Sequence, residues 1–177
     1  IRDTSVTGVQ TCALPIFADD ADDVATAASL RAGGANVVGV ISEEHGLPDR
    51  ICGAGFLRDI ASGARFSMYR EVPEPGRTCH IDADGVEAAC ATVLPQIAAS
   101  DLVVLNKFGK LEAAGQGLWP VLAEAVAADK PVLLAVSGRH ADAFRAFAPD
   151  AAVLPMDEAA LGRWWDAVHH AEAAGRA

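Results

Sequence analysis

Residues 101–119 read DLVVLNKFGKLEAAGQGLW, an apolar run followed at once by polar and cationic residues. The run Leu102–Leu105 is typical of a strand buried on both faces, as in a parallel sheet. Asn106, Lys107 and Lys110 then fall at its carboxyl end, the edge where open α/β sheets bind ligands. The chain has only three lysines and a formal charge of -10. Two lysines in this short segment therefore indicate a local cationic site.

Strand and helix patterns alternate along the rest of the chain. Buried strands are predicted at 37–42, 131–136 and 151–154, and a β-hairpin at 56–69 turning at 61–63. Helices are predicted at 19–32, 82–97, 118–128, 141–147 and 157–173. This alternation predicts an α/β fold of three layers, a mostly parallel sheet with helices on both faces and a β-hairpin insertion.

Two of the predicted helices carry clear packing faces. In the helix at 82–97, apolar residues including Val86, Cys90 and Val93 share one face, so Cys90 is expected in the core. Pro95 is expected to kink that helix near its end. In the last helix, Trp164 and Trp165 belong to an apolar stripe that predicts packing rather than cofactor binding.

The beginning of the chain is unusual. Residues 6–16, VTGVQTCALPI, resemble the translation of a sequencing-library adapter. Residues 1–17 are therefore predicted to be an adapter-derived segment, and residues 18–177 a single α/β domain. The alternative is an ordinary N-terminal strand with residues 12–16 as its apolar part. If a natural start was replaced, the first strand of the domain has been lost or imitated.

Composition excludes several classes of function. The isoelectric point near 4.8 argues against a nucleic-acid-binding surface. No apolar run reaches the roughly 18 residues that a membrane span needs. After residue 17 the cysteines are Cys52, Cys79 and Cys90, with no CxxC pair. Three unpatterned thiols are typical of a reducing compartment, so a cytoplasmic protein is predicted.

Two clusters could in principle hold a metal ion, and neither is predicted to do so. Four aspartates at 19–23 could bind a divalent cation, but they are better explained as a solvated helix N-terminus favoured by the helix dipole. Cys79 and His80 with Cys52 and His45 could form a zinc site, but zinc sites usually show paired ligands at short spacing. The sequence thus identifies no metal site and no cofactor.

Four segments carry a resemblance to a known family: GFLRDIASG at 55–63, RTCHID at 77–82, LVVLNKFGKLEAAGQG at 102–117 and PVLLAVSGRH at 131–140. Over residues 18–170 the chain resembles a bacterial domain of unknown function that is often encoded beside molybdate-transport ATPase genes. It is similar, more distantly, to small P-loop nucleoside-triphosphatases. The resemblance implies an NTPase-like fold and molybdate-transport components as partners.

The chain departs from the NTPase pattern at the positions that would act on phosphate. Gly109 and Glu112 keep the pattern, but Asn106 and Lys107 stand where two acids would be. The phosphate-loop motif GxxxxGK[ST] occurs nowhere in the chain. Phosphoryl transfer needs a phosphate cradle and a metal-bound acid. The chain as given is therefore predicted not to hydrolyse nucleotides.

The favoured hypothesis is a non-hydrolytic module that binds a small anion, either a nucleotide phosphate or an oxyanion such as molybdate. The anion-binding residues are predicted to be Asn106, Lys107, Lys110, Glu112, Ser137, Arg139 and His140. Lysine supplies a point charge and arginine a bidentate fork, and Glu112 is expected to position a lysine.

Three alternatives stay open. The lysines could simply cover the sheet edge with their aliphatic stems. The protein could be a hydrolase whose N-terminal phosphate loop is missing from this chain. It could also be a structural or regulatory partner of a molybdate transporter.

Overall fold

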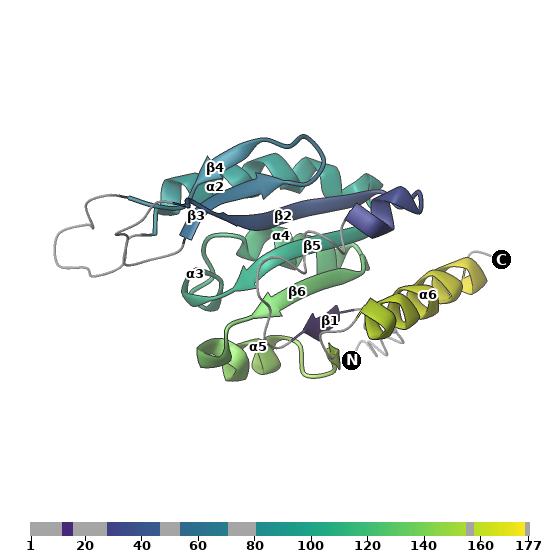
Figure 1. Cartoon of the computed structure of the whole chain (residues 1–177). Coiled ribbons are helices and arrows are strands. Elements are labelled where there is room, and N and C mark those ends of the chain that lie inside the picture. Colours follow the sequence, from purple (N-terminus) through teal and green to yellow (C-terminus); the bar gives the residue numbers. More distant parts are fainter. Residues whose placement is uncertain (1–11, 16–27, 47–53, 71–80, 155–157, 176–177) are drawn as a thin grey trace.

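The structure is a computed structural model that describes residues 12–15, 28–46, 54–70, 81–154 and 158–175. Its centre is a seven-stranded sheet in the order β4-β3-β2-β5-β6-β1-β7 (Figure 1). The strands are β1 (Cys12–Pro15), β2 (Val37–Glu44), β3 (Ala54–Asp59), β4 (Arg65–Ser67), β5 (Leu102–Phe108), β6 (Val132–Val136) and β7 (Ala152–Leu154).

Four of the six strand pairs are parallel, and two are antiparallel. β2, β5, β6, β1 and β7 pair in parallel, whereas β3 and β4 form an antiparallel hairpin that ends one edge of the sheet. The predicted α/β fold, mostly parallel sheet and hairpin insertion are therefore confirmed. The hairpin turn is held by the buried Asp59 carboxylate, which accepts hydrogen bonds from the Ser62 backbone N–H and hydroxyl.

Helices cover both faces of the sheet. They are α2 (Ala83–Val93), η1 (Leu94–Ala99), α3 (Lys110–Ala113), α4 (Trp119–Ala127), η2 (Gly138–His140), α5 (Ala141–Phe147) and α6 (Glu158–Gly175), and residues 28–32 are also helical. The larger core lies under α2, α4 and α5, and the smaller one under α6 (Figure 1). Cys90 lies in the larger core, as predicted, and Trp164 and Trp165 pack against the smaller one.

Two boundaries of secondary-structure elements differ from the predicted ones. The helix that begins at Ala83 does not simply kink at Pro95 but changes to a 3-10 helix at Leu94, with Pro95 in its first turn. Proline cannot donate an α-helical hydrogen bond, and the tighter helix accommodates it at its start. The central strand β5 runs to Phe108. Asn106 and Lys107 therefore lie within the strand, near its carboxyl end, instead of following it.

The β2–β5 pair is held close by a glycine. Gly39 has φ 118°, and a Cβ atom added there would lie 1.9 Å from the Val104 carbonyl oxygen. Only glycine tolerates both this backbone conformation and this approach. The contact brings the two strands into register from Val37 with Leu102 onward, and so aligns their carboxyl ends.

Residues 12–15 form β1, which lies between β6 and β7. The segment predicted to be adapter-derived thus supplies an interior strand, as the alternative of an ordinary N-terminal strand predicts. Its adapter origin stays a prediction. The acidic segment 19–23, Cys52, Cys79 and His80 lie outside the described residues. Among the described residues, no helix is long and apolar enough to cross a membrane.

Candidate functional site

The carboxyl ends of β5 and β6 are joined by backbone pairing. Asn106 lies opposite Ala135, and Phe108 lies opposite Val136. One residue further, the Ser137 N–H donates a hydrogen bond to the Phe108 carbonyl at 3.0 Å. β6 therefore lies directly beside the central strand β5, and the segments that follow the two strands share one edge of the sheet.

Lys107 is the extra residue of a β-bulge in this edge. The β5–β6 register shifts between Asn106 and Phe108, which leaves Lys107 exposed between two buried neighbours. Because of the shift, Phe108 enters the larger core with Leu105 and packs edge-to-face on Phe144, with ring centroids 5.1 Å apart. Bulges re-aim side chains in this way. The bulge thus anchors both sides of Lys107 in the core and directs Lys107 itself to the surface.

Asn106 is buried and ties β5 to β2. The Ser42 hydroxyl of β2 lies 3.1 Å from the Asn106 side-chain oxygen, to which it donates a hydrogen bond. A buried amide needs such partners, because an unpaired polar group away from water is costly. Asn106 therefore has a structural task at the strand end, where the NTPase pattern would have an acid.

Glu112 stabilises the loop around it through hydrogen bonds to the backbone. Its carboxylate is buried, and its two oxygens accept hydrogen bonds from the backbone N–H groups of Gly109 and Leu118, each at 3.0 Å. The first bond caps the start of α3, since Gly109 is its N-cap residue. Gly117 makes room, because a Cβ atom there would lie 2.6 Å from a Glu112 oxygen. No ion pair between Glu112 and a lysine occurs among the described residues, so the predicted positioning of a lysine has no contact to support it there.

The remaining predicted residues lie on the turns that leave the edge. Lys110 is exposed at the first position of α3. After β6, the His140 N–H donates to the Ser137 carbonyl at 2.8 Å and closes a tight turn. Ser137 and His140 are half-buried in this turn, while Arg139 is exposed. The fold thus gathers the seven predicted residues at the ends of two neighbouring strands, with Lys107, Lys110 and Arg139 facing solvent.

Metal binding at described residues finds no support. No group of three or more histidine, cysteine, aspartate or glutamate side chains that could hold a metal ion occurs in the described part of the chain. His45, considered above as a zinc ligand, lies edge-to-face against Tyr69 with ring centroids 5.6 Å apart.

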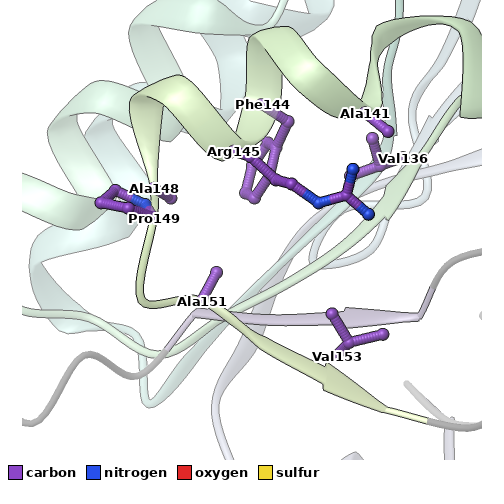
Figure 2. A pocket seen from close by; sticks show the side chains of 8 residues that line it. All are labelled: Val136, Ala141, Phe144, Arg145, Ala148, Pro149, Ala151 and Val153. Carbon is purple, nitrogen blue, oxygen red and sulfur yellow. The ribbon is translucent and has the colours of Figure 1, made fainter.

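Sequence reasoning missed a small cavity beside this edge. It has a volume of about 150 Å³ and lies between α5 and the strands β6 and β7 (Figure 2). Val136 and Phe144 form part of its wall, and Ala148 and Ala151 leave the space open. The only sequence signal was the run of alanines around Phe144, which by itself looks like ordinary helix composition.

Comparisons with known proteins agree with the expected resemblance in part. A family model described as "Protein of unknown function (DUF2478)" matches residues 19–164. The Molybdenum import ATP-binding protein ModC 2 of Bradyrhizobium diazoefficiens is 36% identical over 109 residues, which cover 60% of this chain and 12% of that protein. No solved structure matches the chain significantly. Because the family model spans most of the chain, including both strand ends of the candidate site, the chain belongs to the DUF2478 family.

Proposed function

We propose that the chain binds a small anion, a nucleotide phosphate or an oxyanion such as molybdate, at the carboxyl ends of β5 and β6 and does not hydrolyse it. The observation that carries this proposal is the bulge at Lys107. It presents a cationic side chain at a strand end whose backbone is fixed by the Ser137–Phe108 hydrogen bond. Strand ends of this kind are the usual ligand edge of α/β sheets.

The chemistry of the surrounding groups fits a tetrahedral anion. Lys107 offers a point charge and Arg139 offers a planar fork of N–H donors. The Ser137 hydroxyl can add a neutral hydrogen bond. These exposed cations stand out against a formal charge of -10, so long-range attraction of an anion to the chain is weak and binding depends on local contacts.

The match to ModC 2 supports the choice of ligands. That protein's name describes molybdenum import and ATP binding, and the matched region is a small part of it. For this chain we therefore propose nucleotide or molybdate binding. We also propose an NTPase-like fold and a role beside transport components. The missing GxxxxGK[ST] motif favours binding without hydrolysis.

Isothermal titration with molybdate, phosphate and ATP at low salt tests the proposal. Lys107→Ala and Arg139→Ala should each weaken binding by about 1–3 kcal/mol if each side chain makes a charge-assisted bond. Lys130→Ala is the matched control, because Lys130 donates to the Ser100 carbonyl at 2.7 Å near the opposite ends of the strands. Binding should also weaken with added salt.

The result also separates this proposal from its alternative. If the wild-type chain binds none of these anions at millimolar concentration, the strand-end site is wrong and a structural or regulatory partner of a transporter becomes the better hypothesis. If the control lysine matters as much as Lys107, binding is only a general charge effect.

A further inference from the structure

The cavity under α5 lies beside the strand-end site, but none of the seven predicted anion-binding residues is among its described lining residues. Its walls come from the end of β6, from one side of α5 and from β7 (Figure 2). We propose that it binds a small monocarboxylate whose apolar body is no larger than about one six-membered ring. This proposal stands on the cavity alone and does not depend on anion binding by Lys107.

The volume limits the size of the ligand. An apolar cavity of about 150 Å³ is large enough for a benzene ring. Most sites for drug-sized ligands are several-fold larger, roughly 300–1,000 Å³. A nucleotide does not fit such a space, whereas a single ring or a short branched chain does.

The walls favour an apolar body over water. Val136 and Phe144 are buried, and Ala148 and Ala151 are half-buried. A stable buried water needs two to four polar partners, and these four side chains are all apolar. At the rim, Val153 is 56% exposed, the largest value among the exposed large apolar side chains of the described residues. A ligand lying across Val153 would remove this apolar surface from water.

Among the described lining residues, Arg145 is the one that carries a charge. Figure 2 shows its guanidinium group extended from α5 toward Val136 and Ala141, so that it borders the cavity instead of pointing away from it. One of its nitrogens lies 3.2 Å from an Asp142 oxygen, but both side chains are mostly exposed. Such surface pairs are weak, so the remaining N–H groups can donate hydrogen bonds to a ligand.

The neighbouring aspartate selects among anions. A planar carboxylate matches the guanidinium fork with two parallel hydrogen bonds. A phosphate dianion would bring a second negative charge close to Asp142, which repels it. A monocarboxylate with its apolar body in the cavity and its charged group on Arg145 therefore satisfies both the walls and the rim.

Benzoate is the probe for this inference, with benzyl alcohol as its neutral counterpart of similar size. Binding is followed by two-dimensional NMR of the labelled chain, which reports shifts at α5 and β7. Benzoate should bind about tenfold more tightly than benzyl alcohol if the carboxylate pairs with Arg145. Arg145→Gln should remove that preference, whereas Arg163→Gln on α6, an exposed arginine outside the cavity, should leave it intact.

Filling the cavity gives an independent test. Ala148→Leu should weaken benzoate binding at least about tenfold, because the added side chain occupies the space of the ring. Ala151→Leu serves the same purpose if Ala148→Leu disturbs folding, and thermal unfolding identifies that case. Loss of benzoate binding in a folded filled variant, with molybdate or phosphate titration unchanged, supports the inference.

Two outcomes would overturn it. One is no benzoate binding by the folded wild-type chain at about 10 mM, far weaker than a specific pocket gives. The other is benzoate binding that both filled variants retain. Since Lys107→Ala should leave benzoate binding unchanged, failure of this inference and failure of the strand-end proposal are distinguishable.

Discussion

Glu112 illustrates how a single carboxylate can hold a loop together. It links the start of α3 to the residue before α4 through Gly109 and Leu118. We predict that Glu112→Ala lowers the free energy of unfolding by about 2–4 kcal/mol, because two backbone N–H groups lose a charged acceptor and one of them is buried. Urea denaturation measures this loss.

Glu112→Gln is the matched control for that change. It keeps the shape and one acceptor oxygen, but its amide NH₂ faces a backbone donor, so an intermediate loss is expected. A loss below about 0.5 kcal/mol for Glu112→Ala, the range of ordinary surface changes, would show that the two bonds contribute little.

Cys90 gives a prediction for pH. Burial in the larger core raises the pKa of its thiol, and the negative charges of Glu87 and Glu112 add to that rise. The folded chain therefore holds the thiol proton to higher pH than the unfolded chain does. Stability from this group is complete below the unfolded thiol pKa of about 8.5 and is lost as pH rises toward the folded value.

The measurement compares Cys90→Ala with the wild-type chain between about pH 8 and pH 10, a window that spans the usual thiol pKa. The wild-type free energy of unfolding should fall more steeply with pH, because only the wild-type chain has this thiol to ionise on unfolding. Equal slopes in the two proteins would contradict the predicted role of Cys90.

For single residues, the sequence predicted where side chains lie in the fold better than which groups they contact. Lys107 and Ser137 were expected at neighbouring strand ends because apolar runs at 102–105 and 131–136 indicate buried parallel strands. The bulge was not predictable, since a register shift depends on how two strands distant in sequence pair. The partners of Glu112 were missed for a similar reason, because they are backbone groups placed by a turn with no side-chain signature.

At the scale of elements, Gly39 is the point where β2 and β5 come closest. We predict that Gly39→Ala costs at least about 2–4 kcal/mol, because the added Cβ atom meets the Val104 carbonyl and the backbone is left-handed. Gly162→Ala in α6 is the control, since a Cβ atom there meets nothing within 4 Å. That change should stabilise the chain by about 0.5–1 kcal/mol. Thermal unfolding of the two variants separates them, and similar midpoints would refute the argument.

The strand β1 allows a second prediction at this scale. Deleting residues 1–17 removes β1 and leaves β6 and β7 without the strand that pairs with both. The melting temperature should fall by more than about 4 °C, the shift expected for 1 kcal/mol or more in a chain of this size. Solubility should fall too, because an unpaired sheet edge invites aggregation. An unchanged melting temperature would mean that residues 12–15 add little to the sheet.

Elements with a clear apolar pattern were predicted well, and these include the short helix at 141–147 and the short strand at 152–154. The helix at 83–93 and the strand at 37–44 bury regular apolar positions, which the sequence displays directly. β1 has only four residues and ends at a proline, so its strand character comes from the neighbours that pair with it. The cavity could not be predicted from the sequence, because it arises where α5 and β7 do not fill the space between them.

For the whole molecule, the central prediction is the absence of nucleotide hydrolysis. The chain lacks the phosphate-loop motif, and Asn106 and Lys107 occupy the end of the central strand in place of acids. Without these groups, several kcal/mol of transition-state stabilisation are lost. Phosphate release with Mg²⁺ and ATP or GTP measures this directly. A turnover near 1 s⁻¹, at the low end of usual enzyme rates, would contradict the prediction.

The place of β1 in the sheet also sets an order of assembly. Among the described residues β1 is synthesised first, yet its partners β6 and β7 lie about 120–140 residues later in the chain. Closing so long a loop is entropically costly, and non-local pairing of this kind slows folding. During synthesis on a ribosome, β2, β5 and the β3–β4 hairpin can pair while β1 is still unpaired. The insertion of β1 between β6 and β7 then follows the synthesis of both partners, and the edge of β6 stays unpaired until that step.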